Sequence, residues 1–83
     1  MKAVAYSKAA AKTLRRISAA EADRIRLKVR QFADDPASLA NNVKALVGTP
    51  YVRLRVGDWR VVMDDRGNVL EVLKVGPRGG VYD

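Results

Sequence analysis

The chain contains no cysteine and no histidine. Without cysteine it has neither disulfides nor thiolate metal sites, and without histidine it lacks the commonest catalytic base and metal ligand. Zinc chemistry and the Ser/His/Asp and Cys/His catalytic triads are therefore excluded, and we expect no metal or other cofactor. No apolar run approaches the roughly 18 residues of a membrane-spanning helix, and the N-terminus lacks a signal-peptide pattern. We expect a cytoplasmic protein without a membrane partner.

Length and charge narrow the possibilities further. The 83 residues predict one domain, residues 1–83, with a single modest core. The net charge of +7 is uneven, because residues 1–33 hold nine lysines and arginines against two acids, whereas the other residues carry seven of each sign. Such a basic segment favours a polyanionic partner, either nucleic acid or an acidic protein segment. The same pattern also occurs on solvated helix faces that bind nothing.

The first part of the chain has the pattern of a strand followed by a helix. Residues 2–6 are a short apolar stretch that predicts a strand, and Ser7 after them is a good helix N-cap. The residues that follow are rich in helix formers and predict a helix that stops near Ile17. Its apolar face consists of Ala10, Leu14 and Ile17. Its lysines and arginines lie away from that face.

A second helix is predicted to follow at once, which makes a helical hairpin. Ser18 and Glu21 have capping-box spacing, so the Ser18 hydroxyl can accept from the Glu21 amide while the Glu21 carboxylate reaches back. The helix is expected to end near Asp34, because Pro36 disfavours helical geometry in the residue before it. Residues 35–50 contain many turn residues and are predicted to be a connector that can hold one short helical turn.

From residue 51 onward the pattern is that of β-strands. Strict alternation places Tyr51, Arg53 and Arg55 on one face of the first strand and apolar residues on the other. In the next strand, after a Gly-Asp turn, Arg60 lies on the face opposite Trp59. If the apolar faces of both strands cover the helices, the arginines emerge together on the bare face.

The last predicted strand, residues 69–75, alternates poorly and would suit a strand buried on both faces. Gly76 and Pro77 after it are expected to break the sheet. The order of elements indicates an α+β fold, β-α-α-β-β-β. In this fold the N-terminal strand and helical hairpin pack on one face of a small, mainly antiparallel sheet.

The bare face is where a ligand could lie. Arginine supplies permanent charge and a planar fork of donors suited to phosphate. An aromatic residue nearby would add a surface for base stacking, worth about 1–3 kcal/mol per base. Arginines on exposed strands are also often merely solubilising. Trp59 is expected in the core rather than as a stacking platform, and Tyr51 could equally pack against the second helix.

Three segments, LVGTPYVRLRVGDWRVVMD, VLEVLKVGPR and the terminal VYD, resemble the RelE/ParE toxin superfamily of prokaryotic toxin–antitoxin systems. The likeness covers nearly the whole chain, and its most specific part is RLRVGDWR. It implies the fold predicted above. The RelE-like branch comprises ribosome-dependent mRNA endonucleases, which cut A-site codons by attack of the RNA 2′-hydroxyl on the adjacent phosphate.

The resemblance also implies roles for individual residues. Arg53 matches a position of catalytic lysine in some members, and Tyr82 matches a C-terminal tyrosine that stacks on a base. Arg60 and Arg78 match phosphate-binding arginines. The catalytic set so implied is Arg53, Arg60, Arg78 and Tyr82, and the further RNA-binding set is Arg55, Tyr51 and Lys74.

Two departures from the family pattern leave the general base unassigned. Tyr51 stands where some members have a second lysine, and Pro77 stands where others have histidine or lysine. Arginine, with a pKa above about 12, is a poor base, so Arg53 does not supply the missing general base. The remaining candidates are a ribosomal group, no base at all, or one of four side chains, Tyr82, Tyr51, Asp58 and Asp64.

ParE-like relatives share the fold, lack much of the cationic site, and inhibit DNA gyrase by binding it. Retention of the arginine cluster favours the nuclease over this alternative. In either case the expected partner is a cognate antitoxin whose acidic or amphipathic segment covers the basic helices. For the nuclease, the ribosome and mRNA are partners as well.

Overall fold

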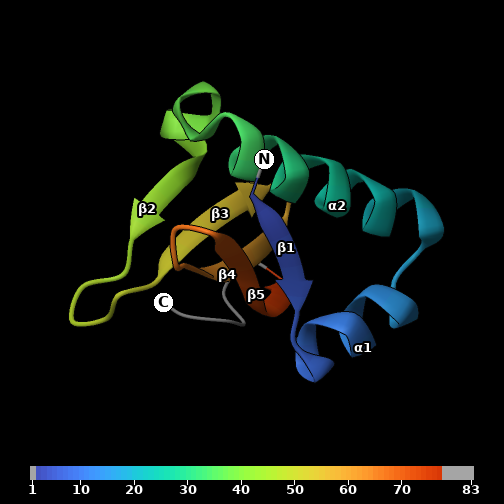
Figure 1. The fold of residues 1–83 in the computed structure, drawn as a ribbon. Helices are drawn as coiled ribbons and strands as arrows, with labels where there is room; N and C mark the ends of the chain where they lie inside the picture. Colours follow the sequence, from blue (N-terminus) through green and yellow to red (C-terminus); the bar gives the residue numbers. More distant parts are fainter. Residues whose placement is uncertain (1, 78–83) are drawn as a thin grey trace.

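In the computed structural model, residues 2–77 are described and form a sheet covered by helices on one face (Figure 1). The elements in chain order are β1 (Ala3–Tyr6), α1 (Lys8–Arg16), α2 (Ala19–Asp34), a 3-10 helix η1 (Pro36–Asn42), β2 (Val43–Ala45), β3 (Val52–Val56), β4 (Trp59–Asp65) and β5 (Val69–Pro77). The strand order is β1-β5-β4-β3-β2, with β1 parallel to β5 and the other neighbours antiparallel. The predicted α+β fold is confirmed.

Serine side chains begin both helices, as predicted. The Ser7 hydroxyl accepts from the Ala10 amide at 3.1 Å, and the Ser18 hydroxyl accepts from the Glu21 amide at 3.2 Å. The Glu21 carboxylate does not complete the capping box. It accepts a hydrogen bond from the indole Nε1 of Trp59 instead, which ties the first turn of α2 to the start of β4.

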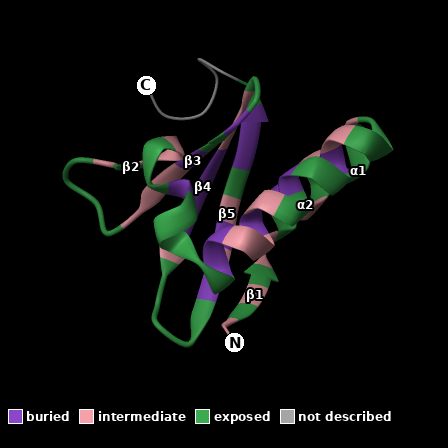
Figure 2. Cartoon of the chain, turned by 90° about the horizontal axis from the view of Figure 1, so that it is seen from above, coloured by how far each residue is buried: buried purple, intermediate pink, exposed green. Residues whose placement is uncertain are grey.

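The core lies between the helices and the sheet (Figure 2). Ile25 and Val29 of α2 are fully buried and belong to the same cluster as Leu54, Val61 and Met63 of β3 and β4. Burying each such side chain stabilises the fold by about 1.5–3 kcal/mol, so this layer supplies much of the driving force. The indole of Trp59 packs partly buried against the cluster, which confirms its predicted place in the core.

The segment predicted as a connector contains a strand. Residues 43–45 form β2 and pair with β3, so the antiparallel part of the sheet has four strands rather than three. The predicted end of the sheet at Gly76 and Pro77 is also wrong, because β5 continues to Pro77, which pairs with Trp59. β1 pairs with β5 from Val69 to Val72, so within residues 2–77 no strand lies beside Pro77 on that side to bond the amide that proline lacks.

A β-bulge explains the poor alternation of β5. Its register with β4 steps from Val62↔Lys74 to Met63↔Val72, which leaves Leu73 as an extra residue. The bulge returns later residues to the core face, and Lys74 is exposed, so the prediction of a strand buried on both faces is wrong. The Ser7 hydroxyl donates to the Leu73 carbonyl at 2.6 Å, which satisfies the bulged backbone.

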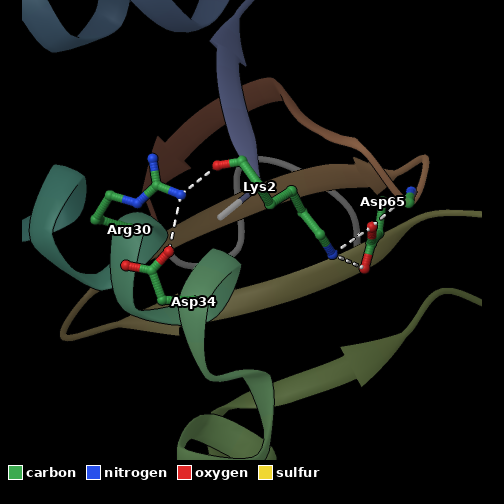
Figure 3. Close-up of polar contacts among 5 residues, drawn as sticks. Lys2, Arg30, Asp34 and Asp65 are labelled. Atoms are coloured by element: carbon green, nitrogen blue, oxygen red, sulfur yellow. Dashed lines mark hydrogen bonds and ion pairs between the residues drawn. The ribbon is translucent and has the colours of Figure 1, made fainter.

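Polar contacts anchor β1 at its N-terminal end, next to Lys2 (Figure 3). The Arg30 guanidinium donates to the Lys2 carbonyl and to the Asp34 carboxylate. The Lys2 ammonium lies 2.8 Å from Asp65 at the end of β4. This hydrogen bond is the main reason why the pKa of Asp65 is lowered from its ordinary value. None of the helices within residues 2–77 is long and apolar enough to cross a membrane.

Candidate functional site

The face of the sheet that points away from α2 carries the predicted arginines. Arg53 and Arg55 alternate along β3 with the buried residues Leu54 and Val56, so their side chains emerge on the opposite face. Arg60 of β4 pairs directly with Arg55 and therefore lies on the same face. The structure thus brings the three arginines together as the alternation predicts.

These arginines line a surface hollow of about 340 Å³. The side chains around it come from the end of η1, from β2, and from β3 and β4. The lining residues are Asn41, Asn42, Val43, Lys44, Arg53, Arg55 and Arg60. We call this the cationic hollow.

Two like-charged pairs face each other across strands in the cationic hollow. Arg55 pairs directly with Arg60, and Lys44 pairs directly with Arg53. Like charges in directly opposite positions destabilise a sheet, by amounts comparable to the 0.2–1 kcal/mol or so of favourable pairs. No acidic residue is among the described residues that line the hollow. The arrangement is one that a bound anion would stabilise.

The other predicted site residues lie outside this hollow or beyond the described part of the chain. Lys74 is exposed on β5 and pairs in register with the fully buried Val62, which separates it from Arg53. Tyr51 is half-buried just before β3 and does not line the hollow. Arg78 and Tyr82 fall outside residues 2–77.

The two acidic candidates for the general base are also away from the hollow's lining. Asp58 is exposed in the turn between β3 and β4. The Asp64 carboxylate is 2.9 Å from the Arg66 guanidinium, so it is already engaged in an ion pair. Neither is an obvious proton acceptor for a ligand bound among the arginines.

Three polar residues of the lining, Asn41, Asn42 and Lys44, were not predicted from the sequence. All three fall in the segment predicted to be a connector, where a three-residue strand gives too short an alternation to be recognised. The available signal in the sequence was Val-Lys-Ala after two asparagines. In the structure Val43 is half-buried and Lys44 is exposed. The amides of Asn41 and Asn42 add neutral hydrogen-bond donors and acceptors to the cationic hollow.

A second hollow, of about 520 Å³, lies between β1 and α2. Its apolar lining comes from Val4, Tyr6 and Leu27, of which Leu27 is 71% exposed. Burial raises the pKa of the Tyr6 hydroxyl, against the opposing effect of Arg26 and Arg30. Within residues 2–77 no group of three acidic side chains gathers in a way that could hold a metal ion.

Solved structures of toxins share this fold. The chain aligns with the archaeal RelE–RelB complex from Pyrococcus horikoshii OT3 at 27% identity and a TM-score of 0.77, covering 96% of this chain and 98% of that one. It aligns with the intact E. coli RelBE toxin–antitoxin complex at 22% identity and a TM-score of 0.70, covering 93% and 96%. For YafQ from E. coli strain BL21(DE3) the identity is 12% and the TM-score 0.77, with 100% of both chains covered. The E. coli likenesses, at such low identity, concern the fold alone.

Sequence comparison gives the family. No curated protein matches the chain significantly. Residues 4–82 match the sequence model of the ParE toxin of type II toxin–antitoxin systems, parDE. The match spans almost the whole chain and agrees with the fold, so the chain belongs to the ParE toxin family, within the RelE/ParE superfamily of type II toxins.

Proposed function

We propose that this toxin is a ribosome-dependent mRNA endonuclease that cuts codons in the A site. The observation that carries the proposal is the cationic hollow, which gathers Lys44, Arg53, Arg55 and Arg60 without a described acidic neighbour in its lining. A fold alone would need none of these charges there, since two directly opposed like-charged pairs work against the sheet.

The chemistry needs fixed positive charge more than it needs any other group. When the RNA 2′-oxygen attacks the adjacent phosphate, negative charge grows on the non-bridging oxygens of the transition state. Preorganised donors aimed at that charge are usually the largest single contribution to catalysis. Arg53 and Arg60 are half-buried in the hollow and would supply planar forks to the phosphate. Arg78 and Tyr82 would complete the site in the roles that the superfamily resemblance implies.

A second candidate function is inhibition of DNA gyrase by protein binding. The match of the chain to the ParE family model favours it, since gyrase is the target implied for ParE-like members. Binding a protein surface would not require a hollow lined by four cations. For this reason we place the nuclease first.

We also propose that an antitoxin with an acidic segment covers the outer face of α1. Four exposed cations lie there, and none of them forms an ion pair within residues 2–77: Lys8, Lys12, Arg15 and Arg16. Several of the solved relatives are themselves toxin–antitoxin complexes. An interaction of this kind should weaken steeply with added salt, because exposed charges are screened.

The two functions are separated by running two assays on the same purified protein. Ribosomes programmed with a defined message should yield new 3′ ends inside the A-site codon, and Arg60→Gln should abolish most of them. Arg26→Gln is the matched control, since Arg26 lies on α2 near the second hollow and pairs with Asp23. Stabilised DNA breaks in a gyrase supercoiling reaction, without mRNA cleavage, would reverse the order of the two candidates.

A further inference from the structure

The edge strand β2 brings a lysine into the cationic hollow. Val43 is half-buried and packs against the core, so Lys44, the next residue, lies on the opposite face of the sheet. Lys44 is directly opposite Arg53 in the β2–β3 register, and the two line the same hollow. The Cβ atoms of directly opposite residues are typically about 4.5–5.5 Å apart, which puts both side chains within reach of one phosphate.

Lys44 differs chemically from the arginines around it. A guanidinium does not give up its proton in a protein, so the arginines can stabilise charge but cannot transfer protons. The side chains of Asn41, Asn42 and Val43 are equally unsuited to proton transfer. Among the described residues that line the hollow, Lys44 alone has a side chain that ordinarily carries a proton at neutral pH and can release it.

The Lys44 ammonium is also available. The residue is exposed, and the structure gives it no ion pair or side-chain hydrogen bond within residues 2–77. Its position on an edge strand leaves the side chain open to a ligand that enters over β2. Arg53, across the strand, would hold the phosphate while Lys44 acts beside it.

We propose that Lys44 is the general acid of the cleavage reaction, an inference that rests on the proposed nuclease function. The 2′-hydroxyl loses its proton to water, the 2′-oxygen forms a bond to phosphorus, and the bond from phosphorus to the 5′-oxygen breaks. The Lys44 ammonium gives its proton to that 5′-oxygen, and the neutral amine regains a proton from water. The products are a 2′,3′-cyclic phosphate and a free 5′-hydroxyl.

The test uses two messages on programmed ribosomes, identical except that one has a bridging sulfur in place of the 5′-oxygen at the cut site. A thiol loses its proton near pH 8.5, far more readily than an alcohol, so a sulfur leaving group needs no acid. The variants are Lys44→Arg, which keeps the charge, and Lys44→Met, which removes it. Thermal unfolding of both variants verifies that they are folded.

General acids typically contribute about 10²–10⁴-fold, so we expect both variants to cleave the oxygen message at least about 100-fold more slowly than the wild type. Lys44→Arg, which keeps the charge, should cleave the sulfur message at close to the wild-type rate, and Lys44→Met should be slowed less on the sulfur message than on the oxygen message. Equal slowing on both messages, or full activity of Lys44→Arg on the oxygen message, would overturn the assignment while leaving the nuclease intact. If the wild type cuts neither message, the proposed function fails and this inference with it.

Discussion

Replacing Arg60 by glutamine should make the protein at least as stable while removing most of its activity. Arg60 faces Arg55 directly across β3 and β4, and its hydrogen bond to the Trp59 carbonyl is long at 3.4 Å. Relief of a like-charged cross-strand pair is worth up to roughly 0.2–1 kcal/mol. We therefore expect the free energy of unfolding of Arg60→Gln to be unchanged or higher by up to about 1 kcal/mol.

The cleavage activity of Arg60→Gln, in contrast to its stability, should fall. Removing one preorganised donor to a charged transition state costs about 10²–10³-fold in rate, so cleavage by Arg60→Gln should fall by that factor. The free energy of unfolding is measured by urea denaturation at low ionic strength, and cleavage by the yield of A-site 3′ ends. Added salt should shrink the gain in stability, since it screens the repulsion that the variant relieves.

Arg55→Gln is the matched control, because it removes the same repulsion from the other side of the pair. Its stability should change as that of Arg60→Gln does. Its loss of cleavage should be smaller, since Arg55 is more exposed and the resemblance implies RNA binding rather than a catalytic role for it. A loss of more than about 1 kcal/mol in Arg60→Gln, beyond what surface substitutions usually cause, would mean that Arg60 is structural. Unchanged cleavage would refute its place in the site.

Three further predictions concern stability and are read by the fluorescence of the single tryptophan during urea unfolding. The pKa of Asp65 is lowered by Lys2, so this pair should stabilise the protein above the unfolded value of 3.8 and lose its effect as pH falls through the lower, folded pKa. The stability difference between wild type and Asp65→Asn should therefore be present at pH 7 and vanish in acid. Glu21→Ala should cost about 1 kcal/mol, because it removes the acceptor for Trp59 Nε1. Gly57→Ala should cost about 1–2 kcal/mol, since Gly57 has a φ of 60°, in the left-handed region that strains residues with a side chain.

The parts of the fold that were predictable are those in which local sequence and burial agree. β3 buries one face, so its apolar and charged residues alternate, and this places Arg53 and Arg55 on one side. In β4, Arg60 precedes the buried Val61 and pairs with Arg55, which places it on that side, although Val62 on the same face is buried too. The starts of the helices were equally predictable, because each serine hydroxyl caps the first turn of the helix that follows it.

The parts that were not predictable depend on pairing between distant segments. Leu73 is an extra residue only in relation to β4, so a bulge cannot be told from a poorly alternating strand without the partner. β2 is three residues long and becomes a strand by pairing with β3. For the same reason Lys44 could not be assigned to the site from its own neighbours in the sequence.

The glutamate of the capping box shows a third limit. Its spacing to Ser18 predicts a reciprocal bond, yet the Glu21 carboxylate binds Trp59, which lies far along the chain. A partly buried indole needs an acceptor, whereas the first amides of an exposed helix can bond to water. The Glu21 carboxylate therefore bonds to its tertiary partner, Trp59, rather than to the neighbouring Ser18 amide.

Cleavage of RNA on the ribosome by the cationic hollow is tested most directly by mapping message 3′ ends. Ribosomes are incubated with purified wild type, with Arg53→Gln/Arg60→Gln, and with the control Arg26→Gln. We predict cuts within the A-site codon for the wild type and the control, and a loss of cleavage of at least about 100-fold in the double variant. Intact message in all three reactions, or equal cleavage by the double variant, would contradict it.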